Sequence, residues 1–325
     1  MSADYIKILM DKDELETIFQ NQNLKRSKQV VGKNDSSTNQ ISEYPIKSYF
    51  HNMCFKITKQ RGEIYGSLHK LINNLLYSNN SNHNDFNPYL LEGVMYALQS
   101  YMGVESLPPN KLTNFEYGFN IELGESPFAL IQESLLFYDL KKDSVDSRHK
   151  NNEIIKKFTF TDYEIKVYDK RAQYGLGKNI IRVEVKYTSA KILEKIGLTT
   201  LDDLLSLEIQ DKLFQDYIHK INELTIIDCW NGCTSLHQVT DRDRSKLEKF
   251  TNANYWAGLR RNKKYMDLNR KRKEFEKLLL KYGLDGRKKN LINSIITKYQ
   301  SMKDDYIQDK SISYYGEMLE KQLIY

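Results

Sequence analysis

Two segments with the alternation typical of β-strands carry carboxylates that could meet over one cation. In Asn114–Asn120, Glu116 and Asn120 share one face, because successive strand residues point to opposite sides. In Arg182–Lys186, Glu184 lies on the polar face and the valines on the other. If the strands are neighbours, Glu116 and Glu184 repel each other unless a cation lies between them, and Mg²⁺ or Mn²⁺ prefers such oxygen ligands. The pattern indicates a metal site, although a strand with a charged outer face alternates in the same way.

A third segment, Tyr163–Lys170, offers candidate nucleophiles. Tyr168 shares a face with Lys166 and Lys170, whereas Tyr163 points to the opposite side of a regular strand. Nearby cations stabilise a phenolate, and attack of a phenolate on phosphorus joins a protein covalently to DNA. The chain has 23 tyrosines, so a given tyrosine is more often a core or surface residue. Both tyrosines therefore stay open as the nucleophile.

Positive charge is concentrated in one segment. The chain carries a net charge of +6, but residues 242–289 hold 17 Lys or Arg against 6 Asp or Glu, so the remainder is net negative. Such an excess is typical of a phosphate-binding surface, because Lys and Arg displace counterions from nucleic acid. We expect this segment to supply much of the affinity for DNA, with Arg270, Lys271, Arg272 and Lys273 at its centre. The alternative is a solvated helix face.

Several classes of protein are disfavoured by missing motifs. The sequence has no phosphate-binding loop ending in Gly-Lys-Ser or Gly-Lys-Thr, no Gly-x-Gly-x-x-Gly, no His-Glu-x-x-His and no Gly-x-Ser-x-Gly. Cys229 and Cys233 have no second pair to complete a zinc site, and with Cys54 they are expected to be reduced thiols. Without a long apolar run or a signal-peptide core at the amino terminus, the expected location is the cytoplasm, with no membrane partner.

The elements that must position these residues form an α+β protein. Its expected parts are an antiparallel or mixed sheet with packed helices, followed by a basic helical carboxy-terminal region. We place a boundary near residue 190, with a catalytic nicking domain over 1–190 and a DNA-binding region over 191–325. Polar loops are expected at 20–42 and 139–152, a helix from Pro127 to about Tyr138, and strands at Phe158–Tyr168 and Ile180–Tyr187.

Four segments occur in the order found in a group of phage and plasmid replication initiators: Gly66–Lys70, Asn114–Asn120, Tyr168–Lys170 and Arg182–Glu184. Over roughly residues 50–190 the chain resembles this group, which is similar to the rolling-circle initiators of small plasmids called Rep trans. The resemblance implies a replication initiator that nicks and joins one DNA strand at an origin with Mg²⁺ or Mn²⁺. A tyrosine attacks a phosphodiester, leaving a 5′-phosphotyrosine and a free 3′-hydroxyl that primes synthesis.

The resemblance also implies roles for particular residues. Asn120 stands where the plasmid family has an Asp, and an ideal strand separates it from Glu116 by about 13 Å, so the two are not expected to bind one ion directly. The implied metal ligands are Glu116, Glu184 and Asn120. The implied catalytic residues are Tyr168 or Tyr163, with Tyr174 more distant, together with Lys170 and His69, and DNA contacts fall to Lys166, Arg182 and Lys186. A lone histidine at a strand end can equally be structural.

Two other functions fit the same sequence. A non-catalytic initiator would use the basic helices to recognise duplex origin DNA, and a relaxase or mobilisation protein would use the same nicking chemistry for transfer. The expected partners are single-stranded and duplex origin DNA, with a host helicase as a further candidate. If Glu116 and Glu184 do face a common ion, we expect removal of either to leave thermal stability unchanged or higher, because it relieves repulsion between carboxylates in the metal-free protein.

Overall fold

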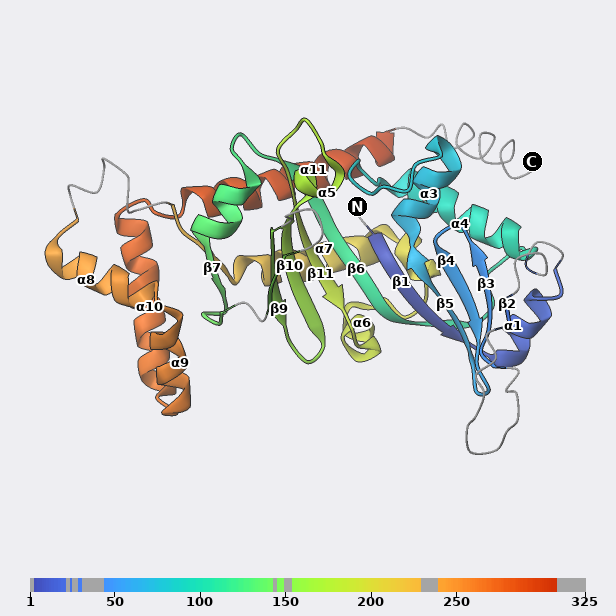
Figure 1. Cartoon of the computed structure of the whole chain (residues 1–325), viewed down its shortest axis with the longest axis horizontal. Coiled ribbons are helices and arrows are strands. Elements are labelled where there is room, and N and C mark those ends of the chain that lie inside the picture. The colour runs from blue at the N-terminus through green and yellow to red at the C-terminus, as the bar shows by residue number, and fades with distance from the viewer. Residues whose placement is uncertain are drawn as a thin grey trace.

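The computed structural model describes residues 3–21, 24, 29–30, 44–142, 145–148, 154–228 and 239–308. Ten strands form one antiparallel sheet in the order β2-β3-β4-β5-β1-β6-β11-β10-β9-β8 (Figure 1). In chain order their bounds are β1 Ala3–Met10, β2 Gln29–Val30, β3 Ile46–Phe50, β4 Met53–Ile57, β5 Gly62–Ser67, β6 Asn110–Glu122, β8 Val145–Arg148, β9 Ile154–Thr159, β10 Tyr163–Asp169 and β11 Ile180–Tyr187. The expected α+β fold is confirmed.

Helices cover one face of this sheet. They are α1 (Lys12–Ile18), α3 (Leu68–Tyr77), α4 (Pro88–Met102), α6 (Ala190–Ile196), α7 (Leu207–Asn222) and α11 (Gly286–Gln308), with a 3₁₀ turn η2 (Asp202–Leu205) and a short α5 (Lys170–Tyr174). Figure 1 shows α7 behind β6, β11 and β10. Alternate residues of β6 point toward α7 because strand side chains alternate between the two faces. Tyr117 and Phe119 are therefore buried against Tyr217 and Phe214 of α7. Tyr299 of α11 stacks on Phe214, with the ring centroids 3.7 Å apart.

A second, smaller core lies between a short strand pair and three helices. The pair is β7 (Leu135–Tyr138) with β12 (Leu224–Ile226), and the helices are α8 (Asp241–Phe250), α9 (Ala253–Arg261) and α10 (Tyr265–Lys281). Trp256 is fully buried there, and its indole N–H donates to the carbonyl of Phe250 at 2.7 Å. This core fixes the three helices on the end of the molecule that carries β7 (Figure 1).

Local expectations fail at four places. The first polar loop, expected over 20–42, contains β2, which pairs with β3. The helix expected up to Tyr138 is a π-helical turn, η1 (Ala129–Ser134), that leads directly into β7. The single strand expected over Phe158–Tyr168 is the hairpin of β9 and β10, since Phe160 pairs back to Tyr163 across a turn. The second polar loop contains β8, which sequence polarity hides because it is an edge strand.

The buried core of the sheet extends beyond residue 190. Leu193, Leu213 and Leu291 of α6, α7 and α11 belong to it. The division of function at residue 190 stays a prediction. Cys54 is a buried free thiol, whereas Cys229 and Cys233 lie outside the described residues. Among the helices of the described part of the chain, none combines the length and apolar character needed to cross a membrane.

Candidate functional site

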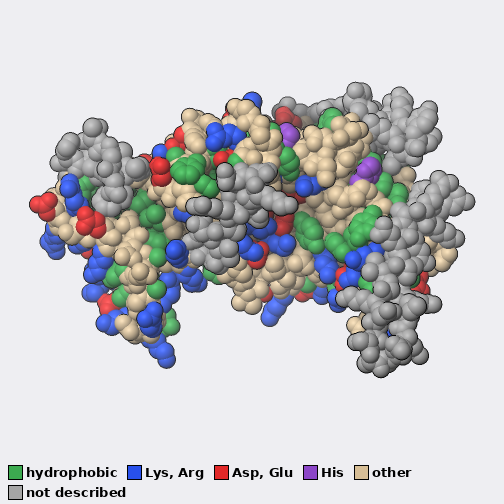
Figure 2. Space-filling model, in the orientation of Figure 1, with side chains coloured by type: hydrophobic (Ala, Val, Ile, Leu, Met, Phe, Trp, Pro, Cys, Tyr) green, Lys and Arg blue, Asp and Glu red, His purple; other side chains and the backbone are tan. Residues whose placement is uncertain are grey.

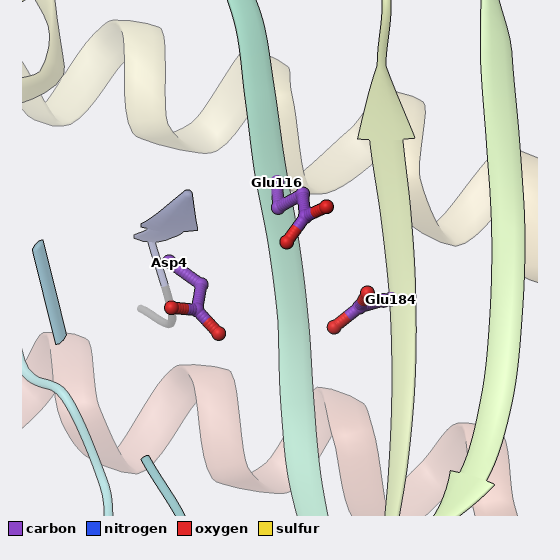
Figure 3. A group of neighbouring side chains, drawn as sticks. All are labelled: Asp4, Glu116 and Glu184. Atoms are coloured by element: carbon purple, nitrogen blue, oxygen red, sulfur yellow. The ribbon is translucent and has the colours of Figure 1, made fainter. Parts of the chain in front are cut away.

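Three carboxylates from adjacent strands meet on the sheet face opposite α7. Asp4 of β1, Glu116 of β6 and Glu184 of β11 each offer an oxygen within 4.8 Å of the others (Figure 3). The sheet order β1-β6-β11 makes these strands neighbours, which confirms that Glu116 and Glu184 lie together. Hereafter these three residues are the acidic group.

A glycine allows β6 and β11 to approach at this point. Gly118 lies opposite Glu184 in the register of the two strands. A Cβ atom on Gly118 would lie 2.6 Å from the Cβ of Glu184 and 2.5 Å from the carbonyl oxygen of Val183, closer than real Cβ atoms approach. Any side chain there would displace Glu184, so Gly118 is required for the geometry of the acidic group.

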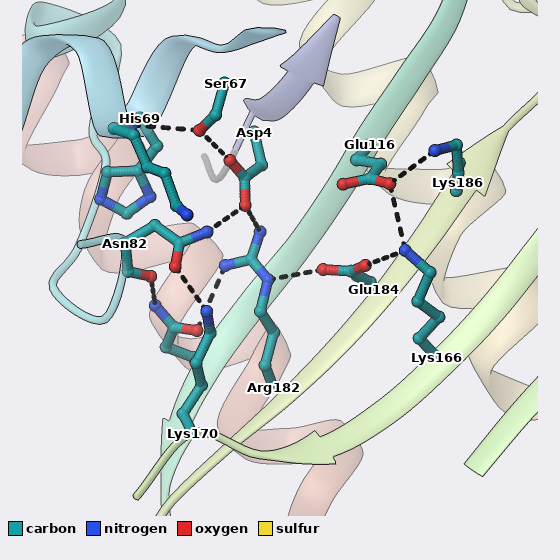
Figure 4. Close-up of polar contacts among 12 residues, drawn as sticks. Asp4, Ser67, His69, Asn82, Glu116, Lys166, Lys170, Arg182, Glu184 and Lys186 are labelled. Atoms are coloured by element: carbon teal, nitrogen blue, oxygen red, sulfur yellow. Dashed lines mark hydrogen bonds and ion pairs between the residues drawn. The ribbon is translucent and has the colours of Figure 1, made fainter. Parts of the chain in front are cut away.

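Three cations neutralise the acidic group. The Lys166 ammonium lies 3.1 Å from Glu116 and 2.8 Å from Glu184, and the Lys186 ammonium lies 3.0 Å from Glu116. The Arg182 guanidinium binds Glu184 at 2.8 Å and Asp4 at 3.1 Å (Figure 4). The carboxylates are therefore held together by protein cations as well as by their strands.

Burial and these cations shift the pKa values of the three acids in different directions. Burial alone would raise the pKa of Glu184, but Lys166 and Arg182 outweigh it and hold that pKa well below its usual range. Burial also opposes ionisation of Asp4, but Arg182, His69 and the hydrogen bond from Ser67 together outweigh it and lower the pKa of Asp4. At Glu116, burial and the charge of Glu184 prevail over the two lysines and raise the pKa. Glu116 is thus the least stabilised anion of the acidic group.

The donor set of the acidic group suits a hard divalent cation. Three carboxylates converge, and carboxylate oxygens are the ligands that Mg²⁺ and Mn²⁺ prefer. Asp4 joins the two expected carboxylates, Glu116 and Glu184, and was not identified from the sequence. Strict alternation would place Asp4 on the face of the buried Ile6 and Ile8, where a purely structural strand carries apolar side chains, so an acid at this position was a signal. The register shift between Ala3 and Ile6 brings its carboxylate to the opposite face, beside Glu116.

Tyr168 contacts the acidic group directly. Its hydroxyl donates to Glu184 at 3.0 Å, and only 7% of the residue is exposed. Burial and the negative charge of Glu184 raise the pKa of the phenol well above its ordinary value. Tyr163 lies on the opposite face, with its hydroxyl 3.3 Å from that of Tyr138, and Tyr174 donates to Asn82 at 2.8 Å.

Lys170 and His69 lie beside the acidic group and are linked to it through Asn82. The side-chain amide of Asn82 donates to Asp4 and its oxygen accepts from Lys170 (Figure 4). Burial and the charge of Arg182 lower the pKa of Lys170 to about 7. His69 is fully buried in α3, and its Nε2 lies 2.8 Å from the side-chain oxygen of Asn84. Burial lowers the pKa of His69 to about 4, which makes it a neutral imidazole at neutral pH.

The other expected site residues are placed differently. Asn120 gives its amide N–H groups to the backbone oxygens of Asn82 and Asn84, and its oxygen accepts from Arg182 at 3.2 Å, so Asn120 supports the site from outside the acidic group. Arg182 is completely buried, which places its guanidinium inside the protein rather than on a DNA-facing surface. Lys166 and Lys186 remain partly exposed, at 22% and 25% of their side chains.

The four consecutive basic residues of α10, at 270–273, lie away from the sheet (Figure 1). Arg270 pairs with Asp267 and Lys271 with Glu274, whereas Lys273 is exposed. Arg272 binds Asp139 and Glu223, joining α10 to the ends of β7 and α7. Neutralising all four residues therefore removes a structural contact as well as charge.

The ion pairs of Glu184 argue against the expectation that the protein tolerates loss of this carboxylate. The loss would leave Lys166 and the completely buried Arg182 with one carboxylate partner each. Removing one partner of a buried ion pair is destabilising because the remaining charge stays desolvated. The expectation did not take these cations into account, although strand alternation places Lys166 and Arg182 on the same face of β10 and β11 as Glu184.

Comparisons with known proteins give one distant likeness. No protein-family model matches the chain, and no curated protein matches it. Among solved structures, the chain is similar to a rolling circle replication initiator protein from Geobacillus stearothermophilus. The two share 14% identity and a TM-score of 0.34, over 60% of this chain and 77% of that one. This is a distant relationship.

Proposed function

We propose that the chain is a replication initiator that cuts one DNA strand by metal-assisted attack of a tyrosine. The observation that carries the proposal is the hydrogen bond from Tyr168 to Glu184, because it joins a candidate nucleophile to a group of three carboxylates. A nucleophile within hydrogen-bond reach of a base, itself fixed by further partners, is the arrangement that covalent catalysis requires. The sequence resemblance to Rep trans initiators points to the same reaction.

The same face of the sheet offers a surface for the phosphate backbone. Five lysines from β1, β4, β9, β10 and β11 line it, each paired with a glutamate and between 22% and 31% exposed: Lys7, Lys56, Lys157, Lys166 and Lys186. Lysines that already lie against carboxylates can turn toward phosphate when a strand binds. We infer that single-stranded DNA lies across this face, with the scissile phosphate at the acidic group.

Asp4, Glu116 and Glu184 would hold Mg²⁺ or Mn²⁺, which supplies positive charge to the phosphate oxygens. Lys166 would leave its place between Glu116 and Glu184, and its ammonium would then stabilise the phenolate of Tyr168. As the tyrosine oxygen bonds to phosphorus, the phenol proton leaves along its hydrogen bond to Glu184 and passes on to solvent water, because a carboxylate with a lowered pKa does not retain it. The bond from phosphorus to the 3′-oxygen breaks, and Lys170, with a pKa of about 7, gives that oxygen its proton.

A test of this proposal needs no knowledge of the origin. The protein is incubated with labelled single-stranded oligonucleotides of random sequence and Mn²⁺, and covalent products are separated on a denaturing gel. We expect a protein-linked band that disappears with a chelator and with Tyr168→Phe. Tyr163→Phe, on the opposite face, is the matched control and should retain the band. Adduct formation by Tyr168→Phe at the rate of the unchanged protein would contradict the assignment.

One observation favours a second function. The acidic group is already neutralised by Lys166, Lys186 and Arg182, which is what a purely structural ion-pair network requires. On this reading the protein binds origin DNA without cutting it. The same gel separates the two functions, because a non-catalytic initiator gives no protein-linked band at any Mn²⁺ concentration.

A further inference from the structure

The turn between α9 and α10 exposes large apolar side chains among cations. Tyr265 is 61% exposed and Met266 is 89% exposed, and Met266 has the largest exposed fraction among the exposed large hydrophobic residues of the described chain. Arg261, Lys263 and Lys264 precede them and are also exposed. Neighbouring exposed apolar side chains with a polar rim are typical of an interaction site. We call Arg261–Met266 the arm tip.

The arm tip is held out from the rest of the molecule. Figure 1 shows α9 and α10 projecting together away from the sheet, and Figure 2 shows Lys and Arg side chains gathered over this part of the surface. Directly before the arm tip, Arg260 donates to the backbone oxygens of Asp139 and Leu140, and one turn earlier in α9 Trp256 is buried. The tip is therefore a rigid projection on an anchored pair of helices.

The backbone of the turn places a lysine where glycine is usual. Lys263 has a φ of 53°, and the N–H groups of Lys263 and Lys264 close the end of α9 onto the carbonyls of Arg260 and Leu259. This is a Schellman ending, in which glycine normally occupies the left-handed position. A residue other than glycine at this left-handed position costs roughly 1 kcal/mol of stability, and this chain nevertheless places a lysine there.

From these observations we propose that the arm tip enters the minor groove of duplex DNA and that Met266 or Tyr265 inserts between base pairs. Proteins that unstack DNA in the minor groove combine an apolar wedge with flanking cations, and the wedge kinks the duplex. The arm tip has both components within six residues. Asp267, the nearest acid, is paired with Arg270 at 2.6 Å, which reduces its repulsion of phosphate. Such unstacking would open duplex DNA into the single strand that the sheet face is proposed to take.

The experiment uses the full-length protein and a short A·T-rich duplex carrying 2-aminopurine beside a TpA step, because such steps unstack readily. A chelator is present, so no result depends on nicking. Unstacking raises the fluorescence of 2-aminopurine, and binding is measured in parallel by anisotropy at several salt concentrations.

We expect the unchanged protein to raise the fluorescence and Tyr265→Ala with Met266→Ala to abolish the rise, with binding weakened by roughly fivefold or more, as for removal of a side chain that stacks on a base. Lys263→Gln with Lys264→Gln should instead lower the salt slope by about 0.9 for each phosphate that the variant no longer neutralises. Leu280→Ala is the matched control, since Leu280 is 62% exposed near the other end of α10 and should change neither property.

Three results would overturn the proposal. They are a fluorescence rise that survives in the double alanine variant, no rise with the unchanged protein, or a loss of affinity in the double alanine variant that is larger for single-stranded DNA or for phosphatidylglycerol vesicles than for the duplex. Each substituted residue is exposed at the surface, so thermal denaturation should show an unchanged fold. Failure of this test leaves the gel assay for nicking unaffected, and the reverse is also true.

Discussion

Replacing Glu184 with glutamine should destabilise the protein far more than the same change at Glu116. Glu184→Gln breaks the ion pairs to Lys166 and Arg182, each at 2.8 Å, and leaves Arg182 completely buried. Breaking a buried pair costs roughly 3–5 kcal/mol, and because Arg182 keeps Asp4 and Lys166 keeps Glu116, we expect the lower end, about 3 kcal/mol. For a chain of this size that lowers Tm by about 4 °C.

Glu116→Gln removes a charge whose ionisation costs stability, whereas Glu184→Gln removes a charge that contributes stability. Burial and the charge of Glu184 raise the pKa of Glu116, so its ionised form is disfavoured in the folded protein. Removing this charge relieves that cost, and the two lysines that lose a partner are partly exposed, so we expect a change of less than about 1 kcal/mol in either direction. Urea denaturation followed by circular dichroism measures both variants at neutral pH. Equal destabilisation, or a larger loss for Glu116→Gln, would refute the reasoning.

The pH dependence separates the two acids further. The folded pKa of Glu184 lies below its unfolded value of about 4.3, so the stability it contributes is present above that pH and is lost as the pH falls further. The difference in stability between the unchanged protein and Glu184→Gln should therefore shrink in acid. For Glu116 the folded pKa is raised, so its ionisation costs stability at neutral pH and protonation removes that cost.

Three further predictions concern neighbouring groups. The folded pKa of His69 is about 4, below its unfolded value, so the unfolded chain binds the proton first as the pH falls. Up to roughly 3 kcal/mol of stability is therefore lost between about pH 6.5 and pH 4. His69→Gln should not show this loss in acid denaturation. Mn²⁺ at a hundred times its dissociation constant should stabilise the protein by about 2.7 kcal/mol in a thermal shift assay. Asp4→Asn should lose this stabilisation, whereas Lys166→Met should increase it because it frees two carboxylates. Equal shifts in all three proteins would exclude this metal site. Lys273→Gln should weaken DNA binding without changing stability, whereas Arg272→Gln should lower Tm because it loses Asp139 and Glu223; the idea fails if both variants behave alike.

Part of this site is readable from the sequence because strand alternation is a local property. The faces of β6 and β11 follow from the period of two, and so does the opposite placement of Tyr163 and Tyr168. The contact of Glu116 with Glu184 needed only the assumption that the two strands are neighbours.

The remainder depends on contacts between distant segments. Asp4 joins the acidic group because β1 pairs with β6, more than a hundred residues later, and the pairing register shifts between Ala3 and Ile6. Asn82 reaches Asp4 and Lys170 from a loop with no periodic pattern. Neither placement is encoded in a short window of sequence, since each results from the packing of the whole sheet.

The most direct measurement is identification of the residue that carries DNA after reaction with Mn²⁺ and single-stranded oligonucleotides. The covalent product is purified under denaturing conditions, digested with nuclease and protease, and analysed by mass spectrometry. The account predicts a nucleotide joined through a phosphodiester to Tyr168 in the peptide that contains Tyr-Asp-Lys at 168–170. Attachment to any other residue, or a complete absence of attached nucleotide while DNA is bound, would contradict it.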